Sequence, residues 1–146
     1  MKLKIMTQEG TLFDGEALSV AGRSPGGEFE ILPGHGAWVS SINPCCLTVA
    51  VSDDRAAEPL SFAVHGGLIE VLTRPHGDSV LILADTAEAA GEIDNERAAR
   101  ARARAEGYLK KRAPQAPEDA QGVDIERARM AFARALARLE AYTAGQ

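Results

Sequence analysis

Basic side chains at helical spacing are the clearest chemical signal in the C-terminal third of the sequence. On a helical wheel of about 100° per residue, they form one stripe in residues 94–112 and another in residues 124–142. The stripes consist of Arg97, Arg100, Arg104 and Lys111 in the first segment and of Arg127, Arg134 and Arg138 in the second. Guanidinium groups bind carboxylates and phosphates through paired hydrogen bonds, so the stripes are candidate contacts for acidic groups.

The histidines and cysteines show no arrangement typical of catalysis or metal binding. His35, His65 and His76 are far apart in the sequence and lack metal-ligand spacing. Cys45 and Cys46 are adjacent, so we expect their side chains on opposite faces of a strand, as free thiols. The sequence has no Gly-x-x-x-x-Gly-Lys-Ser/Thr phosphate loop. We therefore expect no catalytic residues, no metal site and no ATP hydrolysis by the chain itself.

Charge and composition divide the sequence near residue 92. The 146 residues have a net charge of −5, of which residues 1–91 carry −7 and residues 92–146 carry +2. The first part holds 12 of the 15 Val plus Ile, which favour strands, whereas the second holds 15 of the 26 Ala, which favour helix. The mild acidity gives no reason to expect nucleic acid as a partner. We expect two domains, residues 1–91 and residues 92–146.

Short apolar stretches separated by turn residues predict a β-sandwich or barrel in the first part. The nine predicted strands are Leu3–Met6, Thr11–Phe13, Ala17–Ala21, Glu28–Leu32, Trp38–Ile42, Leu47–Val51, Leu60–Val64, Leu68–Leu72 and Val80–Leu83. The segment Val80–Leu83 is apolar on both faces, so we expect it to be a central strand or to lie under the C-terminal part.

Two amphipathic helices are predicted in the second part. Asp94 is the expected N-cap of the first helix, which runs to about Arg112, and Asp124 is the expected N-cap of the second, which runs to about Tyr142. A polar run with two prolines indicates a linker over residues 113–122. Helices joined in this way favour an antiparallel hairpin.

The apolar face of the first helix is rich in alanine. It consists of Ala98, Ala101, Ala105, Tyr108 and Leu109. A methyl group buries little area at about 25 cal/mol per Å². Gly107 lowers the stability of that helix by about 1 kcal/mol relative to Ala. We therefore expect a loosely held hairpin that can detach and rearrange.

Four segments of the sequence, in order along nearly the whole chain, carry a family resemblance. Residues 28–35 read EFEILPGH, residues 62–71 contain two glycines followed by Glu70 and Val71, and residues 80–88 read VLILADTAE. Residues 93–98 read IDNERA and fit the pattern Ile/Leu-Asp-x-x-Arg-Ala. Together these segments resemble the epsilon subunit of F-type ATP synthase, in which the last element binds ATP in some bacterial members.

The resemblance implies an α+β fold, with a β-sandwich of about ten strands followed by an α-helical hairpin. It implies a non-catalytic subunit of the central stalk, whose sandwich contacts the gamma subunit and the ring of c subunits. Its helices would extend toward the catalytic alpha and beta subunits and inhibit ATP hydrolysis. It also implies a peripheral location on the cytoplasmic face of the bacterial inner membrane, a role in proton or ion transport, and no required cofactor.

The resemblance also implies a candidate site for regulatory ATP. Its residues are Glu88, Ile93, Asp94, Arg97, Arg104, Arg134 and Arg138. In a closed hairpin the two basic stripes would converge on the phosphates. The alternative is structural: flanking arginines solvate an amphipathic helix, and Asp94 only caps it.

A second candidate surface lies in and after the loop at residues 33–36. The expected partner-contact residues are Pro33, Gly34, His35, Trp38, Val39 and Ile42. The alternative for Trp38 is an ordinary core position. Two other functions stay open at this point: a free-standing ligand-sensing sandwich with a helical tail, and an enzyme that uses Glu28, His35 and Glu70.

Overall fold

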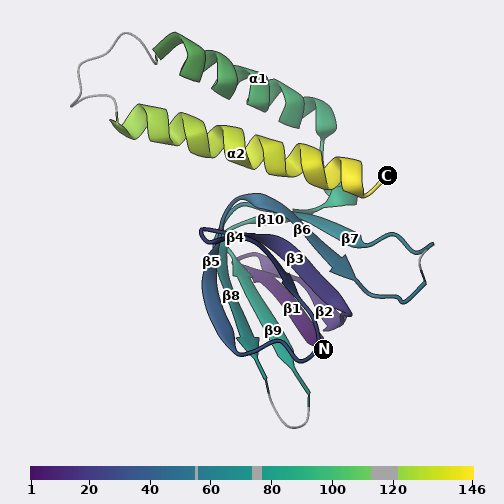
Figure 1. The fold of residues 1–146 in the computed structure, drawn as a ribbon. Coiled ribbons are helices and arrows are strands. Elements are labelled where there is room, and N and C mark those ends of the chain that lie inside the picture. Colours follow the sequence, from purple (N-terminus) through teal and green to yellow (C-terminus); the bar gives the residue numbers. More distant parts are fainter. Residues whose placement is uncertain (55, 74–76, 113–121) are drawn as a thin grey trace.

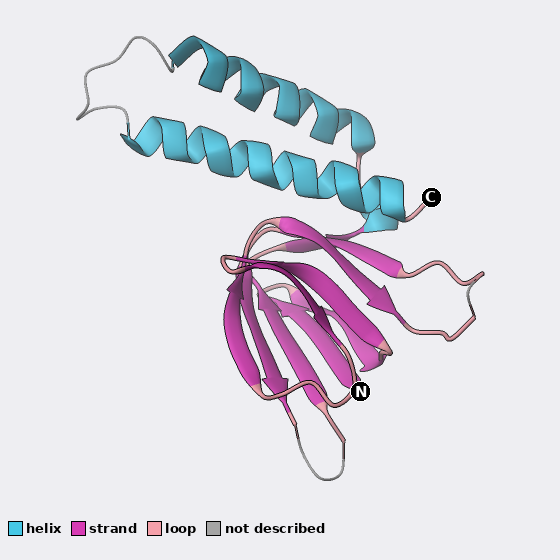
Figure 2. Cartoon of the chain, viewed as in Figure 1, coloured by secondary structure: helices cyan, strands magenta, loops and turns pink. Residues whose placement is uncertain are grey.

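The computed structural model describes residues 1–54, 56–73, 77–112 and 122–146. Within these residues ten strands form two five-stranded sheets that face each other, and two long helices form an antiparallel hairpin outside one sheet (Figures 1 and 2). The predicted α+β fold, a sandwich followed by a hairpin, is confirmed. Most of the predicted linker, residues 113–121, and His76 lie outside the described residues.

The first sheet combines strands from both ends of the sandwich sequence. Its order is β2 (Gly10–Glu16), β1 (Lys2–Thr7), β9 (Ser79–Ala84), β8 (Gly67–Leu72) and β5 (Trp38–Ile42). The pair β1–β9 is parallel and aligns Lys2 with Ser79, whereas the other described pairs are antiparallel. The segment Val80–Leu83 therefore lies in a central strand, as its apolar pattern predicted.

The second sheet supports the hairpin. Its order is β10 (Ala87–Ala89), β7 (Leu60–Val64), β6 (Cys45–Ala50), β3 (Ser19–Ser24) and β4 (Gly27–Ile31). The strand predicted at Ala17–Ala21 begins two residues later, because the Ala17 amide donates to the carbonyl of Met1 at 2.9 Å. All pairs in this sheet are antiparallel.

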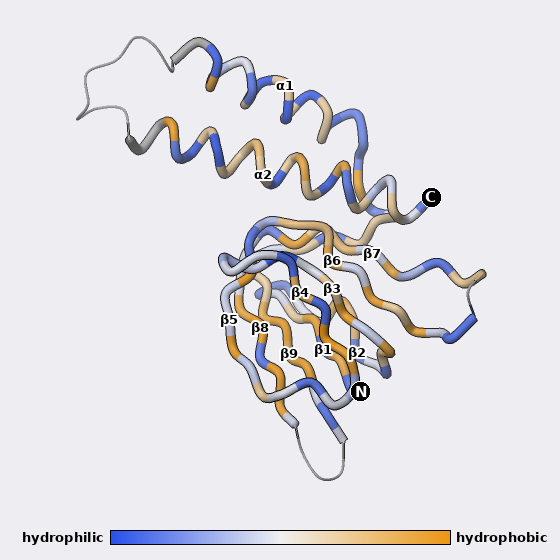
Figure 3. Tube along the Cα trace, viewed as in Figure 1, coloured by the Kyte–Doolittle hydropathy of each residue, from blue (hydrophilic) through white to orange (hydrophobic). Residues whose placement is uncertain are grey.

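The core between the sheets follows from the alternation of side chains along the strands. Inward-facing aliphatic residues are fully buried, and Figure 3 shows the sandwich strands as its most hydrophobic segments. The largest of them are Leu3, Ile5, Val20, Ile31, Leu47, Val49, Val64, Ile69, Val71, Val80 and Ile82. Cys45 belongs to this core, whereas Cys46 packs on the opposite face of β6, and both thiols are free. The predicted placement of the two cysteines is confirmed.

The hairpin follows a short 3-10 helix, η1 (Ala90–Glu92). Asp94 caps α1 (Asn95–Arg112) as predicted, because its Oδ1 accepts the Arg97 amide at 2.8 Å. The second helix, α2 (Gly122–Ala144), begins before Asp124, so the prediction of Asp124 as its N-cap is wrong. The helical backbone starts at Gly122 instead, which places Asp124 inside the first turn.

Small side chains form the interfaces of the hairpin. The helix α2 packs on β6, β7 and η1, and α1 packs on α2 (Figure 1). In the described side chains of the two helices, the buried hydrophobic residues are all alanine: Ala98, Ala105, Ala128, Ala135, Ala137 and Ala141. A small cluster of Ala63, Ile93 and Ala141 joins the helices to the sandwich. Each of these alanines buries little area, which is consistent with a weakly held hairpin.

Candidate functional site

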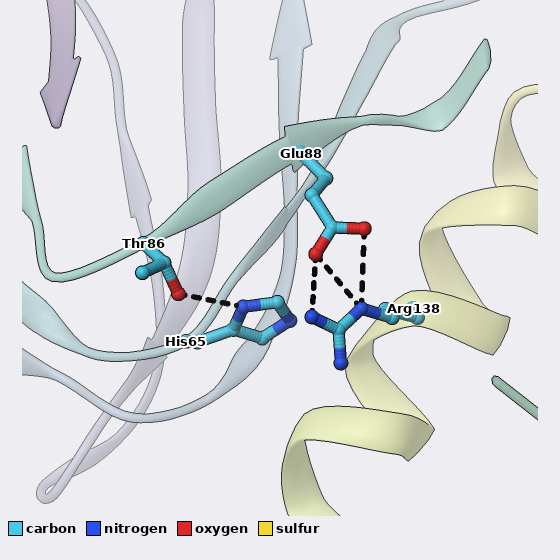
Figure 4. A network of polar contacts seen from close by, with 4 residues as sticks. All are labelled: His65, Thr86, Glu88 and Arg138. Atoms are coloured by element: carbon cyan, nitrogen blue, oxygen red, sulfur yellow. Dashed lines mark hydrogen bonds and ion pairs between the residues drawn. The ribbon is translucent and has the colours of Figure 1, made fainter. Parts of the chain in front are cut away.

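An ion pair fastens α2 to the edge strand β10. Nε of Arg138 donates to both carboxylate oxygens of Glu88, at 2.9 and 3.1 Å, and Nη2 also contacts Oε1 (Figure 4). The two side chains are 30% and 34% exposed. The hydrogen bond from Arg138 lowers the pKa of Glu88 below its usual value, although burial opposes this shift.

His65 lies buried beside this ion pair, directly after β7. Its Nδ1 is 3.0 Å from Oγ1 of Thr86, and its Nε2 has no hydrogen-bond partner within the part of the chain that the structure describes. Figure 4 shows the Nε2 edge of the ring turned toward the guanidinium group of Arg138. Burial, followed by the charge of Arg138, lowers the pKa of His65 to about 4, so the ring is neutral at pH 7.

A pocket of about 370 Å³ opens beside the ion pair, between the hairpin and the segment that leads into it. It is lined by Glu88, Glu92, Asp94, Arg97, Ala98, Ala101, Arg104 and Arg138. This volume falls within the range of small-molecule sites. The lining holds three carboxylates and three guanidinium groups, so its formal charge is balanced.

The pocket brings together five of the seven residues predicted for nucleotide binding. They are Glu88, Asp94, Arg97, Arg104 and Arg138. Ile93 is instead 6% exposed and packs with Ala63 and Ala141 between the hairpin and the sandwich. Arg134 does not line the pocket; it is partly buried, and its charge contributes to the low pKa of His65.

Both parts of the chain match known families. Residues 1–90 match the ATP synthase, Delta/Epsilon chain, beta-sandwich domain, and residues 92–143 match the long alpha-helix domain of the same chain. The chain belongs to the ATP synthase delta/epsilon family. It is 40% identical to the ATP synthase epsilon chain of Bacillus licheniformis over 140 residues, which cover 96% of this chain and 95% of that one. It is 37% identical to the epsilon chain of Clostridium novyi over 139 residues, 95% of each chain.

Two solved structures extend this family relationship. A chain in the Euglena gracilis mitochondrial ATP synthase, resolved with OSCP, F1 and the c-ring, has a TM-score of 0.69 at 25% identity and covers 94% of this chain and 79% of that one. A chain in the Tetrahymena thermophila central stalk and c-ring has a TM-score of 0.62 at 12% identity, covers 96% of both chains, and shares the fold alone. As a delta/epsilon-family member, the chain is a non-catalytic central-stalk subunit of ATP synthase. This result does not favour a free-standing ligand sensor.

The loop predicted to contact partners in this family member lies at the end of the sandwich away from the hairpin. The amide of Gly34 donates to Oδ2 of Asp78 at 2.5 Å, and Oγ1 of Thr73 donates to the carbonyl of His35 at 2.6 Å. The exposed Pro33 belongs to the same loop. Hydrogen bonds to the β8–β9 connection therefore hold this loop in place.

The three predicted contact residues on β5 alternate in exposure. Val39 is 65% exposed, whereas Ile42 is 3% exposed and belongs to the core. Trp38 is partly buried, and its ring packs edge-on against Phe29 with 5.3 Å between the ring centroids. Val39 therefore presents an apolar side chain at the surface, and Ile42 does not.

Other chemistry is not supported in the described part of the chain. Glu28 is in β4 of the second sheet and Glu70 is in β8 of the first, so the sheets separate two of the three residues considered for an enzyme. The described residues hold no group of three or more His, Cys, Asp or Glu that could bind a metal ion. None of the described helices is long and apolar enough to cross a membrane.

Several residues around the ion pair were not predicted from the sequence. Ala98 and Ala101 line the pocket because they are neighbours of the predicted arginines on α1. A helical wheel of the sequence shows this proximity. Glu92 lies in η1, outside both long helices, and no pattern in the sequence indicates that it lines the pocket. His65 follows an apolar strand directly, which is a pattern that indicates a buried histidine, but its partner Thr86 is 21 residues away.

Proposed function

We propose that this chain couples the rotor of ATP synthase to its catalytic head and regulates ATP hydrolysis. In this proposal residues 1–91 contact a gamma subunit and a c-ring, and residues 92–146 act on the catalytic alpha and beta subunits. The complex would hold the chain at the cytoplasmic face of a bacterial inner membrane. The observation that carries the proposal is the match of both parts of the chain to one family, in order and over nearly the whole length.

The interface of the hairpin supports a regulatory role. Alanine side chains and the Glu88–Arg138 pair hold α2 on the sandwich, so a modest interaction elsewhere can compete with the docked state. When α2 leaves, the arginines of both helices become available to acidic groups on the catalytic subunits. That contact would be electrostatic and would weaken with salt.

Deletion of the hairpin tests this regulation. ATP hydrolysis by the assembled complex is measured with the full chain and with a chain that ends at residue 91. We expect faster hydrolysis with the shortened chain, because it lacks the helices that inhibit. Equal rates, with the shortened chain still present in the complex, would leave the helices a structural role only.

We propose further that the pocket beside η1 binds a regulatory nucleotide through its phosphates. Arg97 and Arg104 make no ion pair within the described residues, so their guanidinium groups can donate hydrogen bonds to phosphate oxygens. Arg138 is already paired with Glu88, and the lining carboxylates repel phosphate. These features favour weak binding.

Calorimetry tests nucleotide binding directly. ATP is titrated into the full chain, into Arg97→Ala and into a control, Arg129→Ala, which removes an arginine exposed on α2 and outside the pocket. We expect binding by the original chain and the control, and a loss of tenfold or more in Arg97→Ala. Absence of heat at millimolar ATP would exclude the proposal.

The outer face of the first sheet is the best candidate for the rotor contact. Val39, Leu68 and Leu83 are 65%, 53% and 48% exposed on the adjacent strands β5, β8 and β9. Leu68 lies directly opposite Leu83 in the strand register. Exposed apolar side chains on one sheet face are typical of a protein interface, and the hairpin lies on the other sheet.

A further inference from the structure

The unpartnered nitrogen of His65 lies where the hairpin meets the sandwich. The residue is 5% exposed, and elements that are distant in sequence surround it. Thr86 precedes β10 and contacts Nδ1, and Arg138 of α2 faces the opposite edge of the ring (Figure 4). A buried polar atom without a partner lowers the stability of the fold, and native proteins leave few such atoms unpaired.

The protonation state of the ring follows from its neighbours. A neutral imidazole has one donor and one acceptor nitrogen. If Nδ1–H donates to Oγ1 of Thr86, the lone pair of Nε2 faces the guanidinium group of Arg138, which can only donate. A doubly protonated ring would instead direct an N–H at a group that has no acceptor. The docked arrangement therefore fits the neutral ring alone.

We propose that His65 is a proton-sensitive lock on the hairpin. In its neutral form it accommodates Arg138 and allows the ion pair with Glu88. In its protonated form it repels Arg138, so α2 leaves the sandwich. The inference concerns the isolated chain and does not rest on its proposed role in the synthase.

The charges around the ring support this lock. From α2, Arg138 and Arg134 act on His65, and from β10 only Glu88 carries a negative charge toward it. Protonation would add a third cation beside Arg138 and Arg134, near the carboxylate of Glu88. Asp85 also lies near this turn, with its carboxylate beside Gly66. Glu88 keeps its own charge in mild acid, because its pKa is lowered by Arg138.

The pH window follows from proton linkage. The docked ring has a pKa of about 4, and a solvent-exposed ring has a pKa of about 6.5. The undocked state therefore binds the proton more tightly, and docking weakens as the pH falls below about 6.5. The docking constant should decrease by roughly twentyfold between pH 7 and pH 5, and by only about a further twofold below pH 4.

Amide NMR of the full chain from pH 7.5 to pH 4.5 tests the lock. Hydrogen exchange at Ala137 and Ala141, which are buried in the docked helix, reports docking. The variants are His65→Gln, which keeps a neutral side chain with an acceptor, and a control, His35→Gln, at the far end of the sandwich. We expect the original chain and the control to lose protection as the pH falls, and His65→Gln to stay protected. The same pH profile in all three proteins would overturn the proposal.

A second measurement covers the case in which His65→Gln does not fold. The ring Cε1–H resonances of the original chain are titrated, and those of His35 and His76 are identified from single Gln variants at these two positions. The remaining resonance belongs to His65. Loss of α2 docking that accompanies the titration of His65 supports the lock, and titration of His65 with α2 still docked, at any pH, overturns it.

Discussion

Gly67 lies so close to Leu83 that a Cβ atom at position 67 would be 2.2 Å from the carbonyl oxygen of Leu83. Gly67 also has a φ of +131°, a backbone conformation that other residues rarely adopt. It follows another glycine with positive φ, Gly66, in the turn between β7 and β8. Glycine at position 67 therefore allows β8 to approach β9 closely, and both glycines adopt the positive φ that this turn requires.

Gly67→Ala should destabilise the sandwich strongly. Backbone strain and the clash with Leu83 together should lower the free energy of unfolding by about 2–4 kcal/mol. Urea unfolding measures this change. Gly36→Ala is the control, because Gly36 has ordinary φ and open space around its Cα, and we expect a change within error. Equal stability of Gly67→Ala and the original chain would show that the turn can rearrange.

Glu88→Gln should weaken docking of the hairpin without unfolding the sandwich. The change leaves the partly buried Arg138 without its carboxylate, which should cost about 1–3 kcal/mol of docking free energy. Hydrogen exchange along α2 at pH 7 measures the loss. Glu106→Gln, which removes an ion pair with Lys110 within α1, is the control and should leave exchange unchanged. Equal protection in all three proteins would mean that the alanine contacts alone hold the helix.

Ala141→Leu should displace α2 by overpacking. Ala141 is fully buried against Ala63, so added methylenes should cost about 1–3 kcal/mol at this interface. Cys46 borders the same cluster, and burial raises its pKa to about 11. Its alkylation by a maleimide at pH 7 should therefore accelerate when the helix leaves.

The exposed Ala144 offers the matched control for this substitution. Ala144→Leu adds the same volume near the end of α2 and should leave the alkylation rate of Cys46 unchanged. Acceleration in both variants, or in neither, would contradict the assignment of this cluster as the docking interface.

Leu68→Asp should weaken binding to a gamma-type partner and leave the fold intact. The side chain is 53% exposed, so its replacement costs little in the isolated chain, whereas a buried carboxylate at an interface should lower affinity by tenfold or more. Co-purification and titration measure the effect. Glu28→Lys, a charge change on the other sheet, is the control. Undiminished binding of Leu68→Asp would show that the interface does not include Leu68.

Local patterns were sufficient to predict the elements of this fold. The strand Trp38–Ile42 was predicted with its observed bounds because turn residues flank it on both sides. The cap at Asp94 was predicted because its carboxylate bonds to an amide only three residues away. Such features depend on neighbours in the sequence, which the sequence displays directly.

Features that depend on distant residues could not be predicted in this way. The hairpin covers β6 and β7, so Leu83 in the central strand β9 is still 48% exposed. Arg134 and Arg138 are one helical turn apart and share a stripe, but only Arg138 lines the pocket. Its partner, Glu88, is 50 residues away in the sequence, so the helical pattern alone could not distinguish the two arginines. A helical wheel shows which side chains share a face and contains no information about what lies opposite.

The parallel pairing of β1 with β9 has a consequence for how the protein forms. It joins residues 2–6 to residues 79–83, so the first strand synthesised must await one of the last in the sandwich. Until then the apolar side chains of Leu3 and Ile5 lack half of their sheet and are prone to mispairing. Loop closure of this length slows folding, and the nascent chain is exposed to chaperones or aggregation until β9 has been synthesised. The hairpin follows β9 along the chain, so its residues are synthesised only after those that complete this pairing.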